Sequence, residues 1–164
     1  EGGYSLKILH SSKVFSRFNI SNIYFSMIKI GTNTFRHEDG NNNFVVRGKP
    51  LGWNHGSDGR ESKLGLNLYN DRISMLINAS IGRRELGINS ITKNSYSPYS
   101  NYFSIPFPSG DSRKIFFLQL GAQWWYKSYL SFLIKFDHEK VEKHGKQSEF
   151  EFGLDIYFPI KTKI

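Results

Sequence analysis

Residues 149–158 alternate strictly between apolar and polar side chains, and this alternation constrains the fold more than any other feature of the sequence. One side of the segment carries Phe, Phe, Leu, Ile and Phe, and the other side carries three carboxylates. Successive side chains of a β-strand point to opposite faces of a sheet. The segment is therefore predicted to be a strand with water on one side and an apolar medium on the other.

The same period of two recurs along the chain, which predicts an all-β protein. Seven strands are expected, at residues 4–10, 14–30, 63–69, 73–81, 116–124, 130–136 and 149–158. A change of phase near Asn22 predicts a β-bulge in the second strand. Turn-forming residues at 70–72 and 127–128 predict two β-hairpins.

The predicted connections alternate between short and long. Those after residues 10, 69 and 126 are short, whereas those from about 31, 82 and 137 are long. Outer-membrane barrels have short periplasmic turns and long extracellular loops. The chain is therefore predicted to belong to a transmembrane antiparallel β-barrel, with loops 83–114 and 137–147 outside the cell. Since such barrels usually have an even number of strands, residues 1–164 are expected to be a single domain, the C-terminal portion of a larger barrel.

Composition agrees with a barrel, although the mean hydropathy of −0.45 would also suit a soluble protein. Only every second residue of a barrel strand faces lipid, so hydropathy does not separate the two classes. Aromatic residues make up 16% of the chain, and barrels concentrate them at the membrane boundaries. The sequence contains no run of about 18 or more apolar residues, so no transmembrane helix is predicted. A soluble carbohydrate-binding β-sandwich stays open as an alternative.

The net charge of +8 favours an anionic partner, such as acidic polysaccharide, lipopolysaccharide phosphate or nucleic acid, and solubility alone is an equal alternative explanation of the charge. Nucleic acid is not predicted, because the basic residues are scattered among acidic ones. The absence of cysteine removes disulfides and cysteine-based metal sites. The acidic and histidine-containing segments 37–39 and 138–144 are interpreted as solvated charges, so no metal or other cofactor is predicted.

Residues 47–62 are predicted to be a shaped loop, because five of the sixteen are Gly or Pro. The first half resembles a segment of the Wzi-like capsule-assembly proteins, which are outer-membrane β-barrels. The resemblance rests on Arg47-Gly48-Lys49-Pro50-Leu51-Gly52, followed by Gly56 and Asp58, and on similar segments at 83–90 and 106–110. It implies an outer-membrane location and binding or assembly of surface polysaccharide without bond-making chemistry. Membership of a larger outer-membrane assembly stays open.

The residues expected to bind an acidic glycan lie in this loop. Arg47, Lys49 and Arg60 would supply charge-assisted hydrogen bonds. Asp58 would accept hydrogen bonds from sugar hydroxyls, and Trp53 would offer a ring face for stacking. An interfacial anchor in the membrane boundary is the alternative role for Trp53.

The second half of the loop resembles outer-membrane phospholipase A, also a β-barrel. The resemblance rests on Asn54-His55-Gly56-Ser57-Asp58-Gly59-Arg60. It implies a serine hydrolase with His55 as base, Ser57 as nucleophile and Asn67 as the residue that orients the histidine. Two positions depart from the family pattern: Asp58 replaces an Asn, and Asn67 is one residue out of place.

Strand phase argues against this enzymatic alternative. Leu64, Leu66 and Leu68 are predicted to face lipid, and counting back by twos leads to Arg60 and Asp58. Ser57 and His55 fall in the opposite phase, which faces the barrel lumen and also contains Asn67. A nucleophile on that side could not reach membrane lipid, so a binding protein is favoured over an enzyme.

Overall fold

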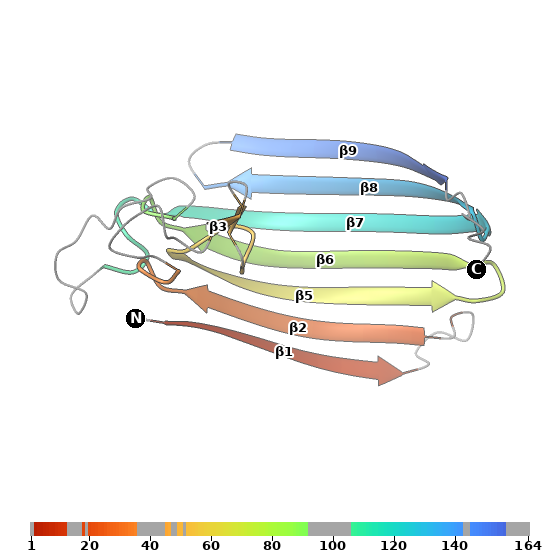
Figure 1. The fold of residues 1–164 in the computed structure, drawn as a ribbon, viewed down its shortest axis with the longest axis horizontal. Helices are drawn as coiled ribbons and strands as arrows, with labels where there is room; N and C mark the ends of the chain where they lie inside the picture. Colours follow the sequence, from red (N-terminus) through yellow and green to blue (C-terminus); the bar gives the residue numbers. More distant parts are fainter. Residues whose placement is uncertain are drawn as a thin grey trace, which may run out of the picture.

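The computed structural model describes residues 2–12, 18, 20–35, 45–46, 49–50, 52–91, 106–142 and 145–156. These ranges form β-strands and contain no helix, which confirms the predicted all-β class (Figure 1). In the same ranges, no helix of the length and apolarity needed to cross a membrane is present. The strands are β1 (Gly3–Ser12), β2 (Ile20–Ile30), β3 (Val45–Val46), β4 (Lys49–Pro50), β5 (Gly59–Asn70), β6 (Met75–Leu86), β7 (Arg113–Lys127), β8 (Leu130–Val141) and β9 (Gly145–Ile156).

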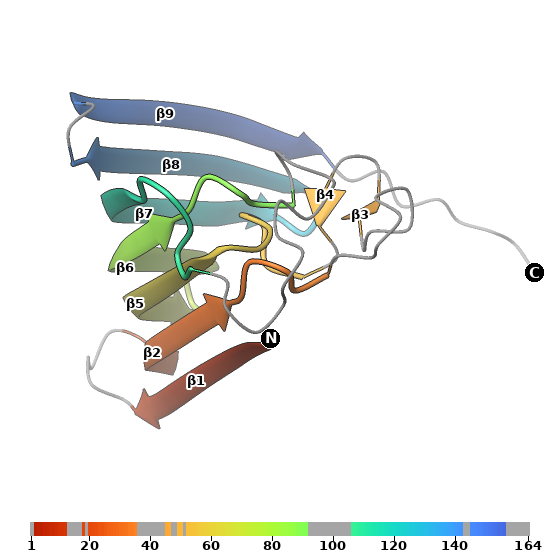
Figure 2. The same ribbon diagram turned by 90° about the vertical axis from the view of Figure 1, so that its left-hand side faces the viewer.

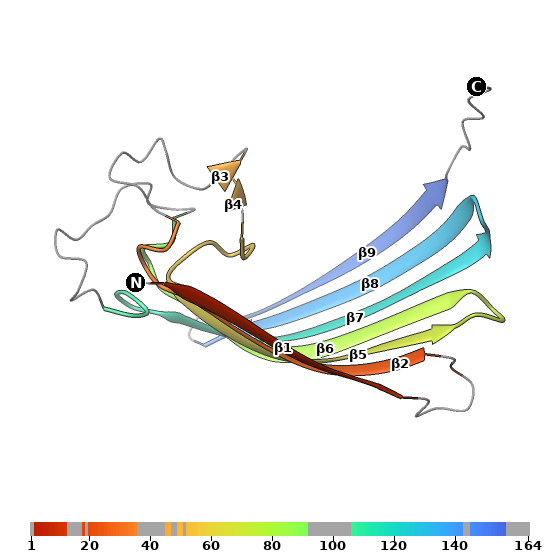
Figure 3. The same cartoon turned by 60° about the horizontal axis from the view of Figure 1, so that its bottom comes forward.

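Seven of the strands form one antiparallel sheet in the order β1-β2-β5-β6-β7-β8-β9, and β3 pairs with β4 in a separate small sheet. In this large sheet, hereafter the main sheet, each strand pairs with the next main-sheet strand along the chain. Both predicted hairpins, β5–β6 and β7–β8, are present. The main sheet curls but does not close into the predicted barrel, because β1 and β9 form two separate edges (Figures 1 and 2). Figures 2 and 3 show β3 and β4 on its concave side.

Strand boundaries differ from the sequence prediction in the most charged segment. The predicted loop 137–147 is mostly strand, because β8 continues to Val141 and β9 begins at Gly145. Its charges alternate between the two faces, and Asp137 lies opposite Glu149 in the β8–β9 ladder. The expected alternation of connection length therefore fails at this place. The predicted loop 47–62 is also shorter, since its last four residues begin β5.

The bulge predicted near Asn22 is absent. The ladders that pair β2 with β1 and with β5 run through Asn22 without a register shift. Ile20 and Ile23 lie on opposite faces because their positions differ by an odd number, so the alternation of an ordinary strand explains the pattern. A register shift lies instead between Trp125 and Lys127, where β7 pairs with β8.

The paired registers give the main sheet one apolar face. This face continues across all seven strands, and the predicted row of Leu64, Leu66 and Leu68 belongs to it. Its residues are Tyr4, Leu6, Ile8, Ile23, Phe25, Met27, Leu64, Leu66, Leu68, Ile77, Ala79, Ile81, Phe116, Leu118, Leu120, Ala122, Trp124, Phe132, Ile134, Phe136, Phe150, Phe152, Leu154 and Ile156.

The opposite, polar face is mostly hydroxyl, amide and charged side chains, joined by hydrogen bonds across strands. Gln119, for example, accepts a hydrogen bond from Ser80 and donates one to Asp137 at 2.8 Å. Glycines make room on this face: a Cβ at Gly65 would lie 2.2 Å from the ring of Tyr24. Small residues on one face allow a sheet to curl toward that face, which is consistent with the polar face being the concave one.

Candidate functional site

Asp58 is the centre of a buried hydrogen-bond cluster at the end of the main sheet where β2 ends and β5 begins. Its side chain has no exposed area. Oδ1 accepts hydrogen bonds from Thr32 Oγ1 at 2.9 Å and from the Ser109 backbone N–H at 2.8 Å. Oδ2 accepts from the Asn89 backbone N–H at 3.0 Å and from the Ser109 hydroxyl. One side chain thereby joins the end of β2, the start of β5 and both ends of the β6–β7 connection.

Asp58 was predicted to contact sugar hydroxyls, but in the structure protein donors occupy both of its carboxyl oxygens. Its φ of 63° lies in the left-handed region, which interrupts the strand phase before Gly59. Counting back by twos from Leu64 therefore does not place Asp58 on the apolar face. The backbone at Gly87 packs closely against the Asp58 side chain, since a Cβ at Gly87 would lie 2.0 Å from Asp58 Oδ2.

Ser57 is also a buried residue of this cluster. Its hydroxyl has no exposed area and accepts a hydrogen bond from the Ile91 backbone N–H at 3.0 Å. The ring of His55 meets the ring of Trp53 edge-on at 5.0 Å between centroids, and its backbone oxygen accepts from the Ser90 hydroxyl. Within the described ranges, no hydrogen bond joins His55 to Ser57. A serine nucleophile needs both a base and access to substrate, and Ser57 has neither.

Asn67 lies too far along β5 to orient His55. It is eight residues beyond Gly59, which is roughly 26 Å at about 3.3 Å per residue of strand. On the polar face it lines a shallow hollow that Tyr24, Lys63 and Asn78 also line. The three residues of the predicted hydrolase site are therefore not brought together.

Sequence analysis missed a buried ion-pair network on the polar face. Arg84 lies between Glu61 and Glu139, with N···O distances of 2.8 and 3.2 Å, and its guanidinium stacks over the ring of Phe117. Arg84 and Glu61 are each only 8% exposed. Burial and the charge of Arg84 lower the pKa of His55, against the opposing charges of Glu61 and Glu139. Residues 52–58 therefore lie close to this network. The lowered pKa of His55 favours its neutral form.

The predicted glycan-binding residues are only partly described. Arg47 lies outside the described residues, and Lys49 belongs to β4. Trp53 is half-buried near the start of β5, on the polar side. Arg60 is 58% exposed, belongs to the apolar side and pairs with Glu85 at 2.6 Å. The structure thus separates Trp53 and Arg60 onto opposite sides of β5.

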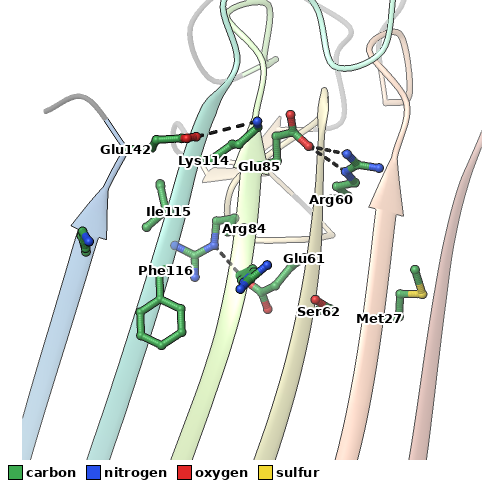
Figure 4. Close-up of a pocket in the computed structure, with 12 residues that line it drawn as sticks. Met27, Arg60, Glu61, Ser62, Arg84, Glu85, Lys114, Ile115, Phe116 and Glu142 are labelled. Atoms are coloured by element: carbon green, nitrogen blue, oxygen red, sulfur yellow. Dashed lines mark hydrogen bonds and ion pairs between the residues drawn. The ribbon is translucent and has the colours of Figure 1, made fainter.

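A row of cations borders the apolar face at its loop end, meaning the end at which β2, β6 and β8 finish. Six successive strands each contribute one residue to this basic rim, which consists of Lys29, Arg60, Arg83, Lys114, Lys140 and Lys146. Two carboxylates lie among them, Glu85 and Glu142, and these pair with Arg60 and Lys114 (Figure 4). A groove of about 940 Å³ opens here, and most of its lining comes from the apolar side.

The other end of the apolar face, at the β5–β6 and β7–β8 hairpins, is aromatic. Trp124 stacks on Phe132 and meets Tyr126 edge-on, each at 5.8 Å between ring centroids. In the last two rows of paired residues on this face, the described strands carry a single Lys or Arg, Lys127, which lies opposite Leu130 beyond the register shift. The two ends of the apolar face therefore differ in chemistry.

The described part of the charged segment, residues 138–142, does not gather metal-ligating side chains on one face. His138 belongs to the apolar side of β8, whereas Glu139 belongs to the polar side, where it pairs with Arg84. In the part of the chain that the structure describes, no group of three or more His, Cys, Asp or Glu could hold a metal ion.

The function of this protein must account for two unlike faces of the main sheet and for a basic loop end. Comparison of the chain with protein-family models, with curated proteins and with solved structures gives no match.

Proposed function

We propose that this protein is an outer-membrane β-barrel protein, with its apolar face toward lipid and its loop end contacting surface polysaccharide. The observation that carries the membrane part is the apolar face itself. It has exposed side chains on every strand, which range from Met27 at 38% to Phe152 at 75%. Soluble monomers rarely expose an apolar surface that spans a whole sheet.

Strand length supports this proposal. The strands of the main sheet have 10 to 15 residues, and a tilted membrane-spanning strand needs about 9–11. Unpaired backbone groups are costly in lipid, so the edges at β1 and β9 are expected to pair with further strands and close a barrel. The polar face would then line the lumen.

The soluble β-sandwich has less support. A sandwich needs a second sheet packed on the apolar face. The only other sheet in the described residues is β3–β4, and Figures 2 and 3 show it on the concave side. The apolar face has no such cover among the described residues.

Two single-cysteine variants test the membrane proposal, because the natural chain has no cysteine. Phe152→Cys and Glu151→Cys are adjacent in β9 but belong to opposite faces. In phosphatidylcholine vesicles, a water-soluble maleimide should label Glu151→Cys and leave Phe152→Cys unlabelled until the protein is denatured. Equal labelling of the two folded variants would contradict the proposal, because both positions are exposed in the isolated sheet.

The polysaccharide part of the proposal is supported by the basic loop end and by Trp53, whose half-buried ring lies near it. Replacing Arg47, Lys49 and Arg60 together by Gln should weaken binding of a uronic-acid polysaccharide, since each cation can form charge-assisted hydrogen bonds with carboxylates. The loss should shrink as salt is added, because salt screens exposed charges. Binding measured by calorimetry checks this. Unchanged affinity at low salt would refute the assignment of these three residues.

A further inference from the structure

The basic rim lies at only one end of the apolar face, and a polysaccharide-binding loop does not require it. Its cations lie on the apolar side of the strands, next to the residues proposed to face lipid. Arg83 is in register with Phe116, and Lys140 with Phe116 and Lys146. The rim is therefore placed at the membrane boundary rather than in the loops.

Four of the six rim cations pair with no carboxylate within the described ranges, and one of these four, Lys29, lies over the ring of Phe107. Arg83, Lys140 and Lys146 are exposed, and none of the three pairs with a carboxylate within the described ranges. The two carboxylates of the rim already pair with Arg60 and Lys114, so these three exposed cations on neighbouring strands repel one another unless a further anion lies among them. This arrangement favours an external anion at the level where apolar side chains end.

We propose that Arg83, Lys140 and Lys146 bind the phosphate groups of anionic lipids in the leaflet at the loop end. This inference rests on the proposed function, because only a membrane-embedded sheet would place the rim beside lipid head groups. Arg matches phosphate with a fork of donors, and Lys supplies a compact charge. The hairpin end, with aromatic side chains and only one cation, Lys127, in its last two rows, suits a leaflet without such phosphates.

The test uses the full chain folded in octyl glucoside micelles and titrated with fluorescent diphosphoryl lipid A, with binding read by anisotropy. The triple variant Arg83→Gln, Lys140→Gln, Lys146→Gln should lose about a hundredfold in affinity, since each cation near an anionic surface contributes about fivefold. The matched variant Lys63→Gln, Arg72→Gln, Lys127→Gln removes the same charge away from the rim. It should keep the wild-type affinity.

Competition and membrane insertion separate the other outcomes. Inorganic phosphate or a uronic-acid polysaccharide that displaces the lipid as well as unlabelled lipid A does would overturn the lipid assignment. The Phe152→Cys shielding experiment in neutral vesicles is repeated on both triple variants. If shielding persists and the rim variant still binds lipid A normally, this inference fails while the membrane proposal stands. If Phe152→Cys is labelled in the wild-type background, both fail.

Discussion

Replacing Asp58 by Ala is expected to open the loop end of the main sheet and to cost about 3–5 kcal/mol. The substitution removes the acceptor of both Ser109 donors, and it leaves the Thr32 hydroxyl and the Asn89 N–H with only their longer hydrogen bonds to Pro106 O at 3.2 Å and Ser109 Oγ at 3.3 Å. Each buried donor left unpaired costs about 1–3 kcal/mol. Amide hydrogen exchange at Asn89 and Ser109 should become much faster, and the midpoint of urea unfolding should fall.

Two companion variants distinguish the lost acceptor from backbone strain. Asp58→Gly removes the acceptor but suits the positive φ, so it should be destabilised nearly as much as Asp58→Ala. Asp111→Ala removes an exposed carboxylate from the nearby segment and should leave exchange unchanged. Slow exchange at Asn89 in Asp58→Ala would show that Asp58 does not hold this cluster.

Replacing Leu120 by Arg is expected to be the most damaging single change to membrane insertion. Leu120 lies at the midpoint of β7, in the middle of the apolar face, between Ala79 and Phe136. An Arg on the lipid side at mid-membrane costs about 2–4 kcal/mol. In water the same change should cost little, because Leu120 is already 43% exposed. Urea unfolding in vesicles and in buffer measures the difference.

The matched control is Gln119→Arg, one residue away on the polar face. There the new guanidinium would lie beside Asp137, which already accepts a hydrogen bond from Gln119. Insertion should therefore be retained. A result in which both variants insert equally well would remove the distinction between a lipid side and a lumen side.

The sequence alone determined the strands and their faces. Alternation of side chains is a local property of extended backbone, so the apolar series in 63–69, 116–124 and 149–158 could be assigned before any pairing was known. Strand ends were less certain. Residues 137–147 carry charges on both faces and no apolar alternation, and only the pairing of β8 with β9 showed that most of them are strand.

The roles of the loop residues were decided by tertiary structure. The partners of Asp58 lie 26, 31 and 51 residues away in the chain, and those of Arg84 lie 23 and 55 residues away. No local sequence pattern indicates contacts between residues so far apart in the chain. The short motif around His55 and Ser57 indicated chemistry because it was considered as an isolated loop. In the folded chain, Ser57 is buried and its hydroxyl accepts a hydrogen bond from the Ile91 N–H.

The basic rim depends on both the local sequence and the tertiary structure. Each of its cations is visible in the sequence as one Lys or Arg near a strand end, where it has no special meaning. Register brings six of them to one edge of one face. Local sequence sets which face a side chain occupies, because the strand period is fixed by the backbone. Which side chains become neighbours depends on the pairing of strands distant in the chain, and that is a property of the tertiary structure alone.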